Sequence, residues 1–185
     1  MGGIVMENII LVDTADRPIG ICEKLEAHAR PILHRAFSIF LHSDGQMLLQ
    51  KRNRNKYHSG GLWTNACCSH PRVGESLETA ASRRLQEELG IQAPLAELFS
   101  FLYFAQFSDH LFEYEYDHVL LGEYSGTPDF NPDESEEMRW VRFPQLRREL
   151  VETPESFSVW FLSAAPRVLD HLEAQQNFSV KQQTG

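Results

Sequence analysis

The sequence predicts a mixed α/β (α+β) fold, in which helices sandwich one mixed sheet and a helical segment ends the chain. Three observations support this: strand-like runs dominate residues 8–143, one amphipathic helix interrupts them, and the pattern after Pro144 is helical. A chain of 185 residues buries roughly 70% of its unfolded surface, so it folds without disulfides or a structural metal. We expect a single domain over 1–185, with flexible ends at 1–7 and 177–185.

Seven runs are expected to form strands, because they alternate apolar and polar residues or are rich in β-branched and aromatic ones. They are Asn8 to Val12, Arg35 to Leu41, Met47 to Arg52, Leu62 to Cys68, Leu98 to Phe107, Leu111 to Leu121 and Met138 to Phe143. The turn residues Ser43, Asp44 and Gly45 predict a hairpin between the second and third runs.

The amphipathic helix is expected to begin after Ser76, which can cap its first turn, and to end at Gly90. Its apolar residues recur every four positions, as on one face of a helix: Leu77, Ala81, Leu85 and Leu89. Two further helices are predicted after Pro144, over Gln145 to Val151 and over Ser156 to about Gln176.

The composition argues against several classes of function. With 17 Lys and Arg against 26 Asp and Glu, the chain carries a formal charge of -9, which opposes binding to nucleic acid or to anionic lipid. No apolar stretch is long enough to span a bilayer, and no signal peptide pattern is present. Cys22, Cys67 and Cys68 are odd in number and include an adjacent pair, so we expect free thiols in a reducing cytoplasm. We expect a monomer that acts on a small molecule.

The run from Leu111 to Val119 alternates acidic and aromatic side chains. Because strand side chains alternate between faces, Glu113, Glu115 and Asp117 share one face. Three aromatic residues, Phe112, Tyr114 and Tyr116, occupy the other face and are expected to pack in the core. A solvated acidic face is one interpretation. The other is a divalent metal site, because His28, His34 and His70 supply imidazoles that would complete it.

The segment from Trp63 to Pro71 holds the adjacent cysteines. If it is extended, Cys68 and His70 point to one side and Cys67 to the other. Cys67 is then a small buried apolar residue. For Cys68, the same buried apolar role is one interpretation. The other is a thiol whose pKa is lowered near a cation and histidines, which would suit it to proton transfer.

Residues 83–91 resemble the second half of a Nudix box, with Glu75 and Arg83 at two of its positions. Arg84 stands where the box has a glutamate, and Ser69 where it has its first glycine. The loss of the glutamate argues against a pyrophosphohydrolase metal cluster. The alternative is a surface helix on which Arg84 and Glu88 pair four residues apart. Four cations remain that could gather on a diphosphate: Lys24, Arg52, Lys56 and Arg84.

Six segments, in order, resemble the type I isopentenyl-diphosphate isomerases, a group with the Nudix fold. They are Glu23-Lys24 with His28, His34 to Ser38, Trp63-Thr64-Asn65 with Cys68 to Pro71, Glu87 to Gly90, Glu113 with Glu115, and Ser158 with Trp160. The resemblance implies a divalent ion (Mn2+, Zn2+ or Mg2+) on His28, His34, His70, Glu113 and Glu115. It also implies Mg2+ with the substrate diphosphate near Glu88.

The same resemblance implies that Cys68 and Glu115 transfer protons, with Tyr103 beside Glu115. The four cations would hold the diphosphate, Trp160 would face the isoprene, and the helical tail would act as a lid. This division of roles suits the chemistry, because moving a double bond through a carbocation needs proton transfer at two carbons. A Nudix diphosphohydrolase and a non-enzymatic metal-binding module are the alternatives.

Overall fold

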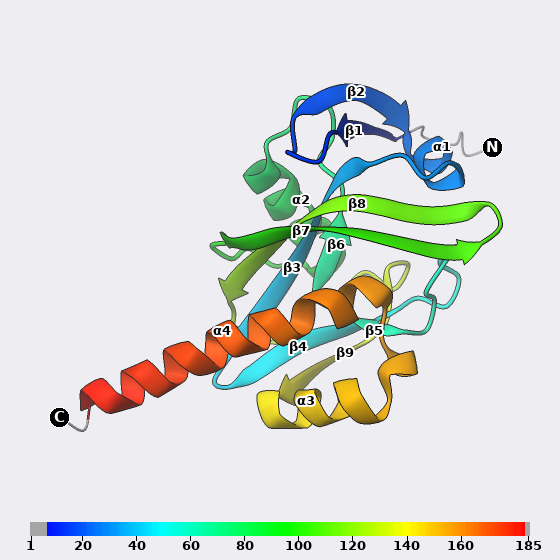
Figure 1. The fold of residues 1–185 in the computed structure, drawn as a ribbon. Coiled ribbons are helices and arrows are strands. Elements are labelled where there is room, and N and C mark those ends of the chain that lie inside the picture. The colour runs from blue at the N-terminus through cyan, green and yellow to red at the C-terminus, as the bar shows by residue number, and fades with distance from the viewer. Residues whose placement is uncertain (1–6, 184–185) are drawn as a thin grey trace.

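The computed structural model describes residues 7–183, and residues 1–6 and 184–185 lie outside it. Nine strands form one strongly curled mixed sheet with helices on both sides (Figure 1). The strands are β1 (Asn8–Val12), β2 (Pro18–Glu23), β3 (His34–Ser43), β4 (Gln46–Arg52), β5 (Trp63–Thr64), β6 (Cys67–Ser69), β7 (Ala96–Ser108), β8 (Leu111–Glu123) and β9 (Ser135–Arg142). The helices are α1 (Lys24–Ala29), α2 (Leu77–Leu89), α3 (Phe143–Glu152), the 3-10 turn η1 (Pro154–Ser156) and α4 (Val159–Gln183).

Strand β3 organises the sheet. It pairs in parallel with β8 over nine residues and antiparallel with β1, β4 and β6, while β7 pairs with β8 and β9 with β4. The predicted hairpin between β3 and β4 is confirmed. Its two turn residues, Asp44 and Gly45, have φ values of 46° and 74°, as a tight turn between twisted strands requires.

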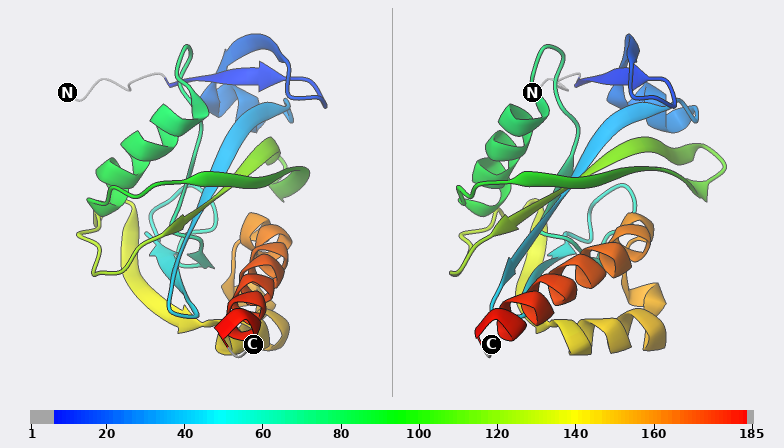
Figure 2. Two further views of the ribbon diagram at one scale, coloured as in Figure 1. Left: turned by 90° about the vertical axis from the view of Figure 1, so that its left-hand side faces the viewer. Right: turned by 60° about the vertical axis from the view of Figure 1, so that its left-hand side comes forward.

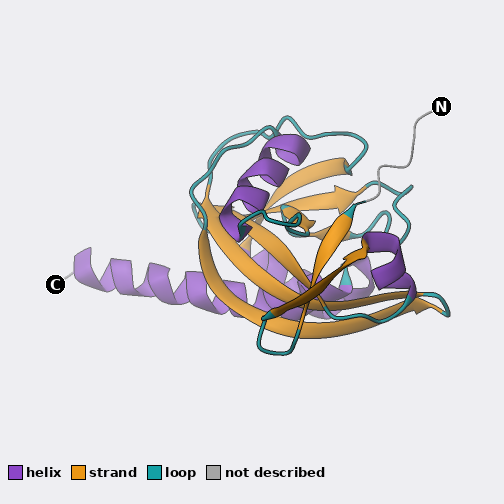
Figure 3. Ribbon diagram, turned by 90° about the horizontal axis from the view of Figure 1, so that it is seen from above, coloured by secondary structure: helices purple, strands orange, loops and turns teal. Residues whose placement is uncertain are grey.

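Both faces of the central strands are buried. Phe40, Met47 and Leu49 pack under α4, whereas Ile39, Leu41 and Leu48 pack under α2, as the alternation of side chains along a strand requires. Figure 2 shows α2 and α4 on opposite sides of the sheet, so the predicted sandwich is confirmed. Seen from above, the strands curl around the middle of the molecule (Figure 3).

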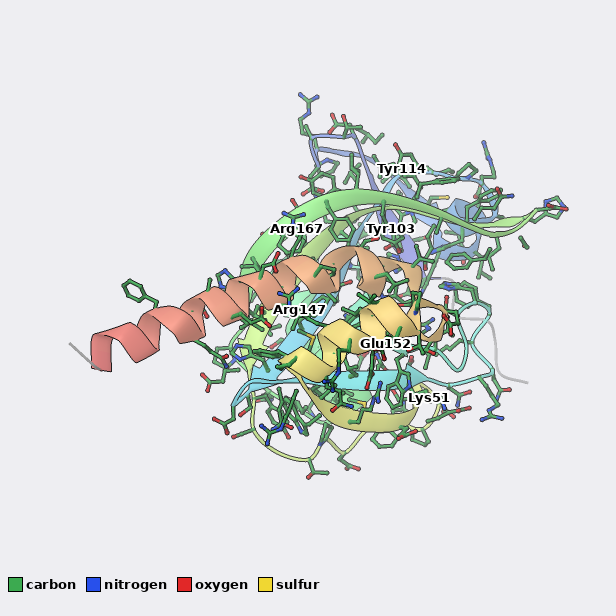
Figure 4. All side chains as sticks on the ribbon, turned by 60° about the horizontal axis from the view of Figure 1, so that its bottom comes forward. Lys51, Tyr103, Tyr114, Arg147, Glu152 and Arg167 are labelled. Carbon is green, nitrogen blue, oxygen red and sulfur yellow. The ribbon has the colours of Figure 1, made fainter. Side chains whose placement is uncertain are left out.

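Helix α2 has the expected boundaries. The Ser76 hydroxyl accepts a hydrogen bond from the backbone of Thr79, and Gly90 ends the helix with a left-handed φ of 64°. Helices α3 and α4 lie against one another (Figure 4) and are joined by Arg147, which donates hydrogen bonds to Asp170 and Glu173.

Four expectations are corrected. The run from Leu62 to Cys68 is two short strands with different partners, because the chain bends at Asn65. Strand β2 and helix α1 have no counterpart in the predicted elements. The helix predicted from Ser156 to about Gln176 begins and ends later, as α4 over Val159–Gln183. Three residues expected in the core, Phe112, Tyr114 and Tyr116, are only partly buried, because the other face of β8 points inward.

Helix α4 packs on the sheet and reaches the pocket with its first turn. Phe161, Ala165 and Leu169 are fully buried against the sheet, so the helix is a packed layer of the molecule. Only its first turn, at Trp160, reaches the pocket described below. Among the described residues, no helix combines the length and apolarity needed to cross a bilayer.

Candidate active site

A pocket of about 190 Å³ opens at the end of the β3–β8 pair. The pocket is lined by most of the candidate catalytic, metal-binding and substrate-binding residues predicted from the sequence. They are Lys24, Arg52, Lys56, Cys68, His70, Arg84, Tyr103, Glu113, Glu115 and Trp160. These residues come from strands β4, β6, β7 and β8, from three helices and from the loops between them. Three other candidates, His28, His34 and Glu88, are buried close behind this wall.

Four buried side chains converge beside the pocket. His28, His34, His70 and Glu115 each offer a ligand atom, and these atoms lie within 4.8 Å of one another. The parallel register of β3 and β8 sets His34 directly opposite Glu115, and α1 carries His28 to them. Residues far apart in sequence therefore form one compact donor set.

The histidines present buried ring nitrogens of the kind that bind a metal ion. The Nδ1 atoms of His28 and His34 donate to the backbone oxygens of Lys24 (2.6 Å) and Ile32 (2.8 Å). This leaves a lone pair on each buried Nε2, neither of which has a hydrogen-bond partner. Burial lowers the pKa of His28, and it lowers the pKa of His70 to about 3. Buried imidazoles with unpartnered nitrogens fit a divalent cation.

Tyr103 joins the two glutamates. Its hydroxyl lies 2.6 Å from Glu113 Oε2 and 2.7 Å from Glu115 Oε2. Burial and the two carboxylates raise the pKa of Tyr103, so the phenol keeps its proton. Burial opposes ionisation of Glu115, but its close contacts with His34 and His70 outweigh burial and lower the Glu115 pKa.

Glu113 lies beside the donor set rather than within it. Its Oε1 is 2.9 Å from His58 Nε2, and its Oε2 accepts from Tyr103. Asp117, the third acid on this face, is also buried and accepts a hydrogen bond from Ser38 at 2.8 Å. Burial and the neighbouring Glu115 raise the pKa of Asp117. The acidic face of β8 is therefore interior, and a solvated face is excluded.

The two adjacent cysteines face opposite sides of β6, as the alternation predicted. Cys67 is fully buried among the apolar side chains under α2, whereas Cys68 lines the pocket with His70. The expected lowering of the Cys68 pKa is wrong: burial raises it to about 12, and the charge of Arg52 only partly opposes this. Cys68 is a thiol at neutral pH in this arrangement.

Four cations surround the rest of the pocket, and three of them contact carboxylates. Lys24 Nζ lies 3.0 Å from Glu7, Lys56 pairs with Glu134, and Arg84 pairs with Glu88. The Arg52 guanidinium lies over the Trp160 ring, 5.2 Å from its centroid. In place of a Nudix-box glutamate, Arg84 thus forms an ion pair with the last box glutamate, Glu88.

Sequence reasoning missed three residues of the site. His58 lies in the pocket wall and stacks on Phe107, with ring centroids 4.4 Å apart. Glu134 pairs with Lys56 from the loop before β9, and Asn65 is fully buried beside Cys68. Asn65 stood in a motif without an assigned role, whereas His58 and Glu134 carried no local signal.

Solved structures share this fold. A Deinococcus radiodurans protein, DR0079, aligns with 87% of this chain and 98% of its own at a TM-score of 0.73 and 22% identity. A MutT protein from Methanosarcina mazei aligns with 76% of this chain and 95% of its own at a TM-score of 0.60 and 17% identity. At these identities, the similarity concerns the fold.

Sequence comparison is more specific. The NUDIX domain model matches residues 32–161. The "Isopentenyl-diphosphate Delta-isomerase 2" of Photorhabdus laumondii is 50% identical over 156 residues, covering 84% of this chain and 88% of that protein. The "Isopentenyl-diphosphate Delta-isomerase" of Burkholderia multivorans is 50% identical over 158 residues, covering 84% of this chain and 89% of that protein. With this identity over most of both lengths, and with the fold described above, the chain belongs to the isopentenyl-diphosphate delta-isomerases of the Nudix superfamily.

Proposed function

We propose that the chain interconverts isopentenyl and dimethylallyl diphosphate in isoprenoid biosynthesis, with the pocket as its active site. One observation carries this proposal beyond family membership. Cys68 on β6 and the Tyr103–Glu115 pair on β7 and β8 line the same small pocket from different strands. Two proton-transferring groups that line one pocket are what moving a double bond requires.

The cations would bind the diphosphate. Lys24, Arg52, Lys56 and Arg84 line the pocket of a chain whose net charge is -9, so they form a local positive site in an acidic protein. The glutamates that contact Lys24, Lys56 and Arg84 hold these side chains in place before substrate arrives. A bound diphosphate would supply several charge-assisted hydrogen bonds to the same groups.

The buried donor set would hold a divalent ion. His28, His34, His70 and Glu115 fit one by the lone pairs described above, and we include Glu113 as a further ligand. When bound, the ion would draw electron density from the Glu115 carboxylate and so tune its basicity. We propose a second ion, Mg2+, carried with the diphosphate near Glu88.

The chain's own residues would move the protons. An alkene is a weak base, so one group must add a proton to the terminal methylene to form a tertiary carbocation. The other then removes a proton from the neighbouring carbon, and the double bond forms there. We assign these steps to Cys68 on one side and to Glu115 with Tyr103 on the other, and either group can take either step. Trp160 would stabilise the cation by about 2 kcal/mol through its ring face.

We further propose that the protein acts as a monomer in the cytoplasm. Every group invoked above comes from one chain, and Cys22, Cys67 and Cys68 are all free thiols. A mass measured by light scattering near that of one chain would support the monomer.

The test is turnover of isopentenyl diphosphate with Mg2+ in D2O. Isomerisation must place solvent deuterium in the methyl group that derives from the terminal methylene, with the diphosphate intact. Release of phosphate or pyrophosphate at the turnover rate would instead indicate a hydrolase. Unlabelled dimethylallyl diphosphate formed at full rate would contradict the protonation step, and no reaction by metal-loaded protein would favour a metal-binding module.

A further inference from the structure

Asn65 joins the two groups that flank the reacting part of the pocket. It is fully buried at the bend between β5 and β6. Its Oδ1 atom lies 3.3 Å from Cys68 Sγ and 3.2 Å from Trp160 Nε1. Trp160 Nε1 is also 3.1 Å from Cys68 Sγ. The thiol, the amide oxygen and the indole N–H therefore form a closed triangle.

The other end of the amide is tied to the backbone. Asn65 Nδ2 donates to the carbonyl oxygens of Ile39 (3.1 Å) and Cys67 (2.7 Å). These two residues are partners in the β3–β6 pairing, so the side chain extends the hydrogen bonding of the sheet at the place where β6 begins. Turning the amide over would set its oxygen against two carbonyl oxygens, so the network fixes its orientation.

The triangle gives the Cys68 sulfur one acceptor and one donor. The amide oxygen of Asn65 can only accept, so the thiol hydrogen points toward it. The indole N–H of Trp160 can only donate, so it points toward the sulfur lone pairs. Asn65 therefore accepts a hydrogen bond from the sulfur when Cys68 is a protonated thiol. Trp160 donates a hydrogen bond to the sulfur when Cys68 is a thiolate.

We propose that Asn65 is a positioning residue for the isomerase reaction, fixing the direction of the Cys68 thiol and the plane of the Trp160 ring through one oxygen. This inference rests on the proposed function, which assigns both residues to the reacting alkene. Asn65 itself is absent from the pocket wall and acts only through them. Displacing a reacting group by about 1 Å costs on the order of a hundredfold in rate.

The test substitutes Asn65→Leu, which keeps the shape and removes every hydrogen bond. With the metal-loaded protein we expect kcat to fall by about 30- to 100-fold. KM for isopentenyl diphosphate should stay within about threefold, because the cations that hold the diphosphate do not contact Asn65. The matched control is Thr64→Val. Thr64 donates to Asn65 and accepts from Ser158 in the same buried network, but no hydrogen bond joins it to Cys68. Its kcat should stay within about threefold of the parent.

A double-mutant cycle separates positioning from general destabilisation. Trp160→Phe keeps an aromatic side chain but removes the N–H together with the five-membered part of the indole, and it also serves if Asn65→Leu does not fold. Because both residues act on one sulfur, the double variant should lose little more kcat than Asn65→Leu alone. Fully additive losses, or equal losses in Asn65→Leu and Thr64→Val, would overturn the proposal.

A chemical measurement is independent of turnover. In a Cys22→Ser background, the rate at which iodoacetamide alkylates Cys68 should change at least threefold in both Asn65→Leu and Trp160→Phe, and not in Thr64→Val. An unchanged alkylation rate in folded variants would overturn the positioning role. If the parent protein shows no isomerase activity but the alkylation rates still differ between the variants as expected, the result would instead contradict the proposed function.

Discussion

At the level of single residues, the alternation along β6 has the clearest consequence. One position apart, Cys67 and Cys68 have opposite environments: one packs among apolar side chains under α2, and the other lines the pocket. Their chemical identity is the same, so any difference in function comes from the face on which each lies.

Cys68→Ala is therefore expected to abolish isomerase turnover, because it removes a proton-transferring group, while leaving the fold and bound metal unchanged. Cys67→Ala should keep most of the turnover and lose about 1 kcal/mol of stability, because it leaves a small cavity in the core. Steady-state kinetics, urea unfolding and metal analysis of both variants provide the check. Equal loss of turnover in the two would contradict the assignment of faces.

His58 is a second residue whose role is set by its neighbours. It lies between the Phe107 ring and Glu113 and meets the edge of Trp160, with ring centroids 5.8 Å apart. His58→Leu should lower kcat by about tenfold, because Glu113 loses the close contact with His58 Nε2 that helps to fix its position. The control is His110→Leu in the exposed turn between β7 and β8, which should leave kcat unchanged. Similar kinetics in the two variants would remove His58 from the site.

At the level of elements, α2 is held to the loop before it by one ion pair. Arg83 donates two hydrogen bonds to Glu75, at 2.7 and 2.8 Å, from a position two turns into the helix. Hydrogen bonding from Arg83 lowers the pKa of Glu75 to about 2. Helix α2, which carries Arg84 and Glu88, is thus held in place by Glu75 and Arg83, two residues that do not line the pocket.

Glu75→Gln should destabilise the protein by about 1 kcal/mol at pH 7, because solvent reaches this pair and weakens it. The lowered pKa means that the ionised carboxylate stabilises the fold above about pH 4.3, its unfolded value, and that this is lost as pH falls toward 2. Urea unfolding at several pH values should show the difference from the parent shrinking over that range. The exposed Glu152→Gln is the control, and a difference that grows on acidification would refute the linkage.

At the level of the whole molecule, the donor set gathers four distant parts of the chain. His28 comes from α1, His34 from β3, His70 from the segment after β6, and Glu115 from β8. A bound ion would therefore join the first and second halves of the fold, and binding to the folded state alone raises stability.

One divalent ion per chain is expected to co-purify, and chelation should lower the melting temperature. At a free metal concentration of about 100 times Kd, the stabilisation is about 2.7 kcal/mol. His70→Ala should abolish the metal-dependent rise in melting temperature, whereas His110→Ala, in the exposed β7–β8 turn, should retain it. Elemental analysis and thermal melting are the measurements. Metal-free parent protein whose melting point does not respond to Mn2+, Zn2+ or Mg2+ would contradict the site.

The local sequence determined much of this protein. The strand alternation that separates Cys67 from Cys68, the turn at Asp44-Gly45 and the cap and stop of α2 all depend on neighbouring residues, so they could be predicted from the sequence. The family resemblance supplied the candidate residues, and most of them line the pocket. Short elements were missed, because α1 has six residues and β2 is an exposed strand at the sheet edge, where burial leaves little pattern.

Only the tertiary structure decided which face of β8 is interior. By composition alone, the aromatic face should be buried and the acidic face exposed, yet Glu113, Glu115 and Asp117 are 5%, 6% and 1% exposed. His34 on β3 lies opposite Glu115, His70 approaches from the segment after β6, and Tyr103 approaches from β7. Ser38 donates a hydrogen bond to Asp117, so the buried acids have partners that no local pattern shows. The same holds for the Cys68 pKa, which burial raises although nearby charges predicted the reverse. Desolvation depends on what the whole chain packs around a group, and the residues adjacent in sequence do not determine it.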